Sequence, residues 1–181
     1  MKILVTGGLG FIGSALLRTL IDSTDCEILN IDSCTYASMP ESLEGRENNL
    51  KYQFKNIDIN DFKAVSRTIE EFKPNKIFHL AAESHVDRSI KNPHEFINTN
   101  IVGTFNILQS LKMFKNELPK DFILIHISTD EVFGTLDFDD APFNESSPYE
   151  PNSPYSASKA SSDLLVRAWN ETYNIKTVIT N

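Results

Sequence analysis

The chain has 181 residues, of which 40% are hydrophobic and 23% are charged, a balance typical of one globular domain with a proper core. Its formal net charge is −8, which argues against a general binder of nucleic acid or anionic membrane, because such proteins need a basic face. There is no apolar run long enough for a transmembrane helix, and the two cysteines show neither metal-site nor disulfide spacing, so we expect a cytoplasmic protein without a bound metal.

Short apolar runs alternate along the chain with longer helical patterns. The expected strands cover residues 2–6, 27–31, 51–57, 76–81, 122–128 and 176–180. The expected helices lie near 11–22, 60–73, 94–116 and 155–173. Several of the strands are continuous apolar runs, as in parallel strands that are covered on both faces. The alternation predicts an α/β fold, a doubly wound parallel sheet of the Rossmann type, over residues 1–181.

A glycine-rich turn follows the first expected strand and opens the first expected helix. The stretch "VTGGLGFIGS" places Gly7, Gly10 and Gly13 at regular spacing. In this context Gly7 permits a tight turn, Gly10 lets backbone N–H groups approach a pyrophosphate, and Gly13 lets the helix pack closely on the strand. The helix N-terminus then faces the negative charge, so the turn predicts a dinucleotide site.

Acidic residues end the next two strands. Asp32 comes about 20 residues after the glycines, where a carboxylate accepts both ribose hydroxyls and repels a 2′-phosphate, which favours NAD over NADP. Asp58 ends the third strand and is placed to receive the adenine amino group, while Ile59 packs against the ring. The alternative for each aspartate is a solvated residue at a strand end.

The stretch "YSASK" places Tyr155 and Lys159 four residues apart, on one face of a helix. A lysine ammonium near a phenol lowers the phenol pKa, so that the phenolate can act as a base on a substrate hydroxyl. The pattern is weak alone but gains weight beside the glycine turn. Thr129, after the fifth strand, would donate a hydrogen bond to the same substrate oxygen.

Thr129 is followed directly by two carboxylates, Asp130 and Glu131. The plain interpretation is a polar turn at the end of a strand. The functional interpretation is an acid and a base, because two close carboxyl groups push their pKa values apart and one can stay protonated while the other is ionised. Adjacent side chains of an extended strand point to opposite faces, so this interpretation requires the backbone to turn at Asp130.

Four motifs together, "TGGLGFIGS", "HLAAESHVDRSI", "ISTDEVFG" and "YSASKASSD", resemble the extended short-chain dehydrogenase/reductase family, and within it the dTDP-glucose 4,6-dehydratases. The resemblance runs from Met1 to Asn181 and implies dehydration of a nucleoside-diphosphate glucose to its 4-keto-6-deoxy form, with NAD recycled. It implies Tyr155 as the base at the C4 hydroxyl, Glu131 as the base at C5 and Asp130 as the acid at the departing C6 hydroxyl.

The resemblance also implies residues that touch the ligands. Ser84 and Thr129 match substrate contacts, and Asn100 matches a structural or proton-relay asparagine. The implied cofactor contacts are Gly7, Gly10, Phe11, Ile12, Gly13, Asp32, Thr35, Asp58, Ile59, Leu80, Ala81, Ala82, Thr99, Tyr155 and Lys159. The implied assembly is a homodimer through the helix at 94–116 and the helix after Tyr155.

The chain stops at Asn181, flush with a core strand, where the family continues into a smaller lobe that grips the nucleotide sugar. We therefore expect a truncated chain that carries the cofactor site but lacks the substrate-binding lobe, and that is nearly inactive alone. Two alternatives remain open: a nucleotide-sugar 4-epimerase or related oxidoreductase, and a non-catalytic NAD-binding fragment. The long Pro- and acid-rich stretch at 137–154 is expected to be a lid or binding loop.

Overall fold

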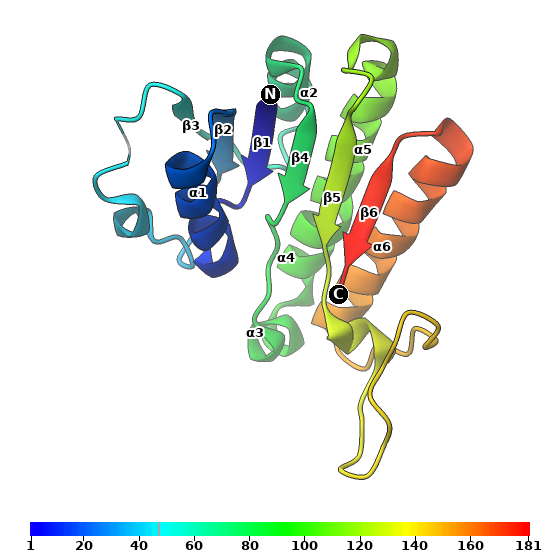
Figure 1. Ribbon diagram of the computed structural model, residues 1–181. Coiled ribbons are helices and arrows are strands. Elements are labelled where there is room, and N and C mark those ends of the chain that lie inside the picture. The colour runs from blue at the N-terminus through cyan, green and yellow to red at the C-terminus, as the bar shows by residue number, and fades with distance from the viewer. Residues whose placement is uncertain (47) are drawn as a thin grey trace.

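The computed structural model describes residues 1–46 and 48–181, and its centre is a parallel sheet in the order β3-β2-β1-β4-β5-β6 (Figure 1). The strands are β1 (Lys2–Thr6), β2 (Glu27–Asp32), β3 (Tyr52–Asn56), β4 (Lys76–His79), β5 (Ile123–Ile127) and β6 (Thr177–Thr180). All five pairings are parallel. The predicted fold class and all six predicted strands are confirmed.

The order of the strands fixes where a ligand can bind. The chain runs outward from β1 to β3 and then returns to place β4 on the other side of β1, with Thr6 opposite both Ile31 and His79. The loops that leave β1 and β4 therefore diverge, and a crevice opens at the carboxyl ends of these strands. In Figure 1 this is the lower edge of the sheet, where α3 and the loop after β5 also lie.

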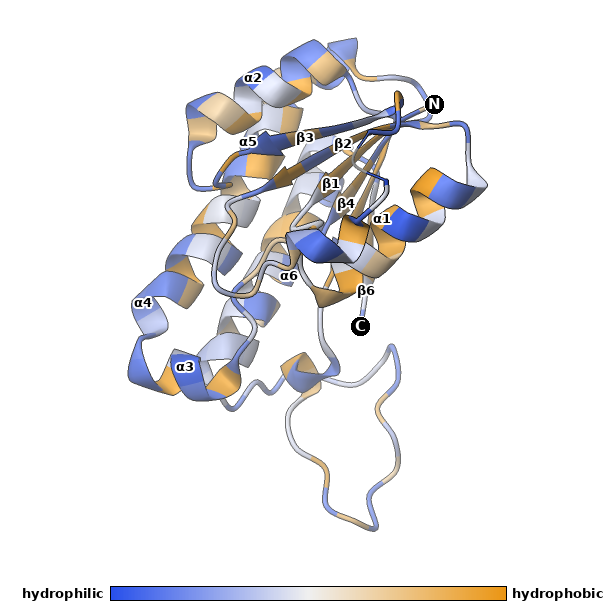
Figure 2. Ribbon diagram, turned by 90° about the vertical axis from the view of Figure 1, so that its left-hand side faces the viewer, coloured by the Kyte–Doolittle hydropathy of each residue, from blue (hydrophilic) through white to orange (hydrophobic). Residues whose placement is uncertain are grey.

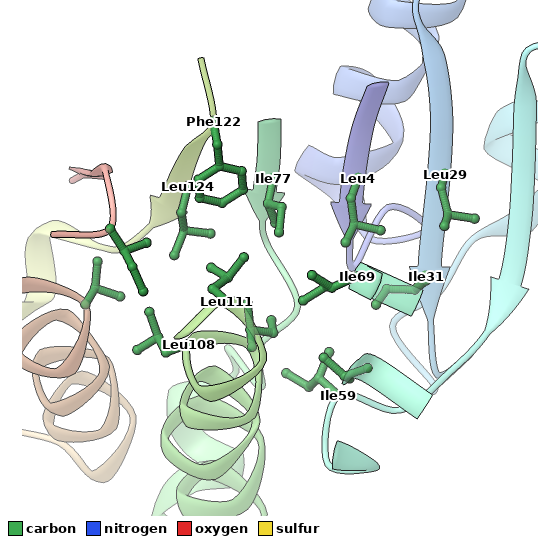
Figure 3. Packing of buried hydrophobic residues seen from close by; sticks show 14 residues of the cluster. Leu4, Leu29, Ile31, Ile59, Ile69, Ile77, Leu108, Leu111, Phe122 and Leu124 are labelled. Carbon is green, nitrogen blue, oxygen red and sulfur yellow. The ribbon is translucent and has the colours of Figure 1, made fainter. Parts of the chain in front are cut away.

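Helices cover the two faces unequally (Figure 2). The helices α2 (Phe62–Phe72), α5 (Thr104–Met113) and α6 (Pro154–Tyr173) lie on one face, while α1 (Phe11–Ser23) lies on the other. The larger core cluster fills the first face, and Figure 3 shows Leu108 and Leu111 of α5 beneath Leu124 and Ile77 of the sheet. On the α1 face β5 is less protected, since Ile123, Ile125 and Ile127 are only half-buried.

The ends of two helices are fixed by side chains near them. Asp61 accepts a hydrogen bond from the Ala64 N–H and so caps α2, which ends at Lys73 in the left-handed region (φ 49°), directly before Pro74. Ser153 and Ser156 form a capping box at the start of α6, with Pro154 in the first turn. This box fixes the first turn of the helix that carries Tyr155 and Lys159.

The predicted helix at 94–116 is wrong as one regular element. The structure divides it into α4 (Pro93–Phe96), a π-helical segment η2 (Ile97–Gly103), α5 and a short 3₁₀ turn η3 (Lys115–Glu117). At Gly103 a Cβ atom would lie 2.4 Å from Ile59 Cδ1, so a side chain there would displace the Ile59 side chain, which follows β3. Three shorter helical elements were not predicted: α3 (Val86–Lys91), η1 (Pro40–Leu43) and η4 (Asp130–Phe133).

Candidate active site

A cavity of about 500 Å³ lies at the carboxyl ends of β1, β2 and β4, a volume ordinary for a small-molecule site. Every cofactor contact implied by the resemblance lines it, together with Ser84. The wall also holds nine residues that the motifs did not single out: Ile31, Ser33, Ala37, Ser38, Ile57, Glu83, His85, Ile127 and Ser128. Most of these are sequence neighbours of predicted residues and could have been found by extending each motif.

The three glycines of the turn have different reasons to be glycine. Gly7 has φ +70°, and a Cβ there would lie 2.6 Å from the Ala81 nitrogen. A Cβ at Gly13 would lie 2.2 Å from the Gly7 oxygen, so both positions are closed to side chains by the fold itself. At Gly10 the contact would be 3.4 Å from the Gly7 oxygen and the backbone is extended, so the fold tolerates a side chain there. The free space at Gly10 belongs to the cavity.

Asp32 is 7% exposed and is held by three donors, so it is not the solvated strand-end aspartate of the alternative interpretation. Its two oxygens accept from the Leu9 N–H at 3.0 Å, the Cys34 N–H at 2.9 Å and the Ser38 hydroxyl at 2.9 Å. These bonds hold the carboxylate at the cavity wall in one orientation. The neighbouring Asp58 accepts only from the Asn60 N–H and is otherwise directed to the open side.

Lys159 is almost completely buried, at 4% exposure, and its ammonium donates to the Ile127 carbonyl at 2.6 Å. Burial lowers the pKa of Lys159 to about 8, although Asp163 acts in the opposite direction. Among the described residues Lys159 is the one lysine or arginine on the cavity wall. A diphosphate in this cavity would therefore rely chiefly on the backbone N–H groups of the glycine turn and the α1 N-terminus.

The expected lowering of the Tyr155 pKa is wrong for the protein alone. Burial raises the pKa of the Tyr155 phenol, a hydrogen bond with Thr129 opposes this rise, and the charges of Glu131, Asp130 and Asp163 add to it. The sequence showed the lysine four residues away but not the burial or the three nearby carboxylates. A cationic ring bound beside the phenol would act in the direction that the sequence-based expectation required.

The buried ammonium predicts a pH-dependent stability. Because the pKa of Lys159 is lower in the folded chain than its ordinary value of 10.5, the penalty is complete below pH 8 and is relieved as the pH rises towards 10.5. Between pH 7 and 9 the free energy of unfolding of the wild type should rise by about 1 kcal/mol relative to K159M, which lacks the titrating group. Urea unfolding of both proteins at each pH measures this difference. A constant difference would show that the ammonium is not desolvated.

The backbone turns where the acidic triplet requires it. Asp130 begins the 3₁₀ turn η4, and Thr129 caps that turn because its hydroxyl accepts from the Glu131 N–H at 3.2 Å. Burial, with a contribution from the charge of Asp130, raises the pKa of Glu131 and makes it a stronger base while it is ionised. The three side chains do not line the cavity but lie next to it, on the Tyr155 side.

A buried polar network supports this corner of the site. Asp163 of α6 is 2% exposed and accepts from the Ser128 hydroxyl at 2.5 Å and from the Tyr149 hydroxyl at 3.0 Å. Its other oxygen approaches His126 Nε2 within 3.0 Å, and the ring centres of His126 and His79 lie 5.2 Å apart with the planes tilted by 40°. Burial lowers the pKa of both histidines, which keeps the pair neutral. The network joins β4, β5, the loop before α6 and α6 itself.

The side chain of Asn100 holds the cavity wall by hydrogen bonds to two separate segments of the chain. Its amide oxygen accepts from the Glu83 N–H at 2.8 Å, and its amide nitrogen donates to the Glu83 carbonyl and the Ser158 hydroxyl. The side chain therefore connects the loop after β4 to the first turns of α6. The resemblance implies either a structural or a proton-relay role for Asn100, and this geometry fits the structural role.

Residues 4–181 match the family model described as GDP-mannose 4,6 dehydratase. The chain belongs to this family. It is 51% identical over 184 residues to the dTDP-glucose 4,6-dehydratase of Neisseria meningitidis serogroup B, an alignment that covers 99% of this chain and 52% of the relative. It is 49% identical over 185 residues to the enzyme of the same name from Haemophilus influenzae, covering 100% of this chain and 55% of the relative. The resemblance to the dTDP-glucose 4,6-dehydratases is thereby confirmed, and the chain spans about half the length of these relatives.

Solved structures agree with the fold. DesIV, a dTDP-glucose 4,6-dehydratase from Streptomyces venezuelae solved with NAD and TYD bound, superposes with a TM-score of 0.89 at 41% identity, over 99% of this chain and 54% of DesIV. The UDP-Glc/GlcNAc 4-epimerase from Campylobacter jejuni superposes with a TM-score of 0.86 at 29% identity, over 98% of this chain and 52% of the epimerase. The fold alone therefore does not separate dehydratases from epimerases.

Two negative findings concern the described residues. In residues 1–46 and 48–181 no helix is long and apolar enough to cross a membrane. In the same residues no group of three His, Cys, Asp or Glu side chains is arranged to hold a metal ion.

Proposed function

We propose that this chain is the NAD-binding and catalytic part of a dehydratase that converts dTDP-glucose to its 4-keto-6-deoxy product. The observation that carries the proposal is the turn at Asp130, which places an acidic pair beside Tyr155 at one end of a dinucleotide-sized cavity. An epimerase needs the Tyr155–Lys159 pair but has no use for two adjacent carboxylates. The about 50% identity to dTDP-glucose 4,6-dehydratases supports the same choice.

The residues of the cavity fit NAD. The space at Gly10 and the α1 N-terminus would receive the pyrophosphate, the fixed carboxylate of Asp32 would accept the adenosine ribose hydroxyls, and Ile59 would pack against adenine. Lys159 and Tyr155 would meet the nicotinamide ribose at the other end. NAD bound there would supply an acceptor for the C4 hydride of the sugar and return that hydride to C6 within the same turnover.

Side chains of this chain transfer the protons of the reaction. Tyr155 takes the proton of the C4 hydroxyl, with Thr129 donating to the same oxygen, and the resulting ketone acidifies the proton on C5. Glu131 removes the C5 proton, and Asp130 protonates the C6 hydroxyl as it leaves as water. When the hydride has been returned to C6, a proton is returned to C5, so that the net change is the loss of one water. The raised pKa of Glu131 strengthens it as the base for the C5 step.

The two alternative functions are a nucleotide-sugar 4-epimerase and a non-catalytic NAD-binding protein. A nucleotide-sugar 4-epimerase is compatible with the fold, which superposes on the Campylobacter jejuni enzyme with a TM-score of 0.86. A non-catalytic NAD-binding protein is the other alternative, because the cavity residues that fit NAD do not include the acidic pair. We expect residues 1–181 alone to bind NAD but to be nearly inactive on the sugar.

We further propose a cytoplasmic homodimer. Both cysteines are free thiols, Cys26 buried and Cys34 exposed, which suits a reducing compartment. Exposed apolar side chains gather on the two helices that the resemblance implicates, at Val102 and Phe105 around the start of α5 and at Leu164 on α6. These residues would supply a helical interface.

A labelled substrate tests the proposed function. The complete gene product, loaded with NAD, is incubated with dTDP-glucose that carries deuterium at C4. A dehydratase gives a product lighter by one water with the deuterium in the C6 methyl group, whereas an epimerase gives an isomer of unchanged mass. Unchanged substrate in the presence of bound NAD would favour the non-catalytic alternative.

A further inference from the structure

The loops after β2 and β4, which leave the sheet on either side of β1, both line the cavity and are joined by side chains. The loop after β2 contributes Thr35 and Ala37 to the wall, and the loop after β4 contributes Glu83. Tyr36 lies between the two wall residues of the first loop, and its hydroxyl donates to Glu83 Oε2 at 3.0 Å. Since Thr35 and Glu83 are 48 positions apart in sequence, this bond connects the walls where no backbone does.

The bridge has a second, independent contact. The guanidinium carbon of Arg88, on α3, lies 3.7 Å from the centre of the Tyr36 ring, a close cation–π stack. Arg88 also forms a long ion pair, at 3.8 Å, with Glu95 of α4. We call Tyr36, Glu83 and Arg88 the Tyr36 clasp. Burial and the bond to Glu83 raise the pKa of Tyr36, so the phenol stays a neutral donor at physiological pH.

Both ends of the clasp rest on rigid supports. On one side Asp32 binds the Ser38 hydroxyl, and Met39 N–H donates to the Leu9 carbonyl at 2.8 Å. On the other side Asn100 holds both backbone groups of Glu83. The clasp residues themselves are at the surface, with Tyr36 52% exposed. Opening the clasp therefore requires only side-chain movement and leaves the core intact.

We propose that the Tyr36 clasp is a gate that slows both the entry and the exit of NAD, an inference that rests on the proposed function. The reaction proposed above returns its hydride within one turnover, so NAD need not exchange with solution. Loss of the reduced cofactor in mid-turnover would strand the keto sugar with no hydride to reduce C6. A closed clasp across the cofactor cavity keeps the two together.

A gate and an ordinary ligand contact differ in their kinetics. The clasp is formed in the protein without ligand, so it must open before NAD enters as well as before it leaves. Weakening it raises the association and dissociation rate constants together and changes Kd little. A contact that merely binds NAD would affect the dissociation rate constant, because the association rate constant of related complexes varies much less.

The experiment uses residues 1–181 and NADH, whose fluorescence reports binding in a stopped-flow instrument. Y36F removes the bond to Glu83 and keeps the ring, while R88M removes the cation–π contact. Each variant should raise both rate constants about three- to tenfold, the value of one hydrogen bond or cation–π contact at a partly exposed site. R46M is the matched control, because Arg46 forms an exposed ion pair with Asp22 away from the cavity. It should bind NADH as the wild type does.

Each other outcome has a distinct meaning. Rate constants of Y36F and R88M equal to those of the wild type would overturn the gate. A rise in the dissociation rate constant alone would overturn it as well and make the clasp a ligand contact. Wild-type chain that binds no NADH would refute the cofactor part of the proposed function, and the gate with it. Urea unfolding of the variants checks that the fold is retained.

Discussion

The double variant D130N/E131Q should lose about 10²- to 10⁴-fold of the dehydration rate of the complete gene product while it still oxidises the sugar at C4. Oxidation depends on Tyr155 and Lys159, whereas the elimination of water needs the acid and the base of the triplet. The amides are nearly the same size as the carboxyl groups. The Asp130 carboxylate accepts one long bond from the Thr129 hydroxyl at 3.4 Å, and the bond that caps the turn is donated by the backbone N–H of Glu131, which the variant keeps. The variant should therefore fold normally and accumulate reduced cofactor and keto sugar.

Absorbance of the reduced cofactor and the mass of the sugar follow the two stages separately. E70Q is a suitable control, because Glu70 is an exposed acidic residue of α2 that does not line the cavity. If the double variant retained full activity on a 4-epimerase substrate, and the wild type never released water, the epimerase alternative would replace the dehydratase. If oxidation failed together with elimination, the triplet would be needed for sugar binding rather than for the elimination step.

The triplet Thr129, Asp130 and Glu131 shows how much of the candidate site could be predicted from the sequence. Three adjacent polar residues after a buried strand indicated a site, and the need for a turn at Asp130 followed from strand geometry. What supplies the turn is the Thr129 hydroxyl, which bonds forward to the Glu131 N–H. That bond is local and could have been suspected from the known preference of threonine for such caps.

Contacts between segments that are distant in the chain could not be predicted from the sequence. Asp163 is joined to Ser128, 35 positions away, and to His126, and nothing in the local pattern of either segment marks this pairing. His79 and His126 are both buried and hydrogen-bonded or paired, and their positions in the sequence do not indicate these contacts. The number of groups in contact and the burial around Tyr155 decide the direction of its pKa, and neither can be read from a four-residue spacing.

The prediction of one continuous helix over 94–116 was wrong for a related reason. Apolar periodicity over 94–116 predicts one helix, but a π-helical segment adds a residue to a turn without a strong change in composition. The cause is tertiary: Gly103 faces Ile59, and Asn100 turns its side chain to Glu83 and Ser158. The short helix α3 has six residues, too few for a helical periodicity to be recognised in the sequence. The strands were predicted better because continuous apolar runs between polar turns are unambiguous in an α/β chain.

We expect G10V to keep the fold and to weaken NAD binding by residues 1–181 by about 100-fold or more, an effect on the order of 3 kcal/mol. A Cβ at Gly10 would meet only the Gly7 oxygen, at 3.4 Å, and the backbone there has φ −74° and ψ 176°, which any residue adopts. The valine methyl groups would instead occupy the space that the pyrophosphate needs next to the α1 N-terminus. Fluorescence titration with NADH and urea unfolding measure the two properties separately.

Two comparisons make the result specific. A15V adds the same branched side chain to an exposed position of α1 and should leave NADH affinity unchanged. G13A should instead reduce stability, because its Cβ would lie 2.2 Å from the Gly7 oxygen, a backbone atom that cannot move without breaking the turn. If G10V bound NADH as tightly as the wild type, the pyrophosphate could not lie against the glycine turn. The cavity would then have to hold its ligand in a different orientation, and the assignment of Asp32 to the adenosine ribose would fail with it.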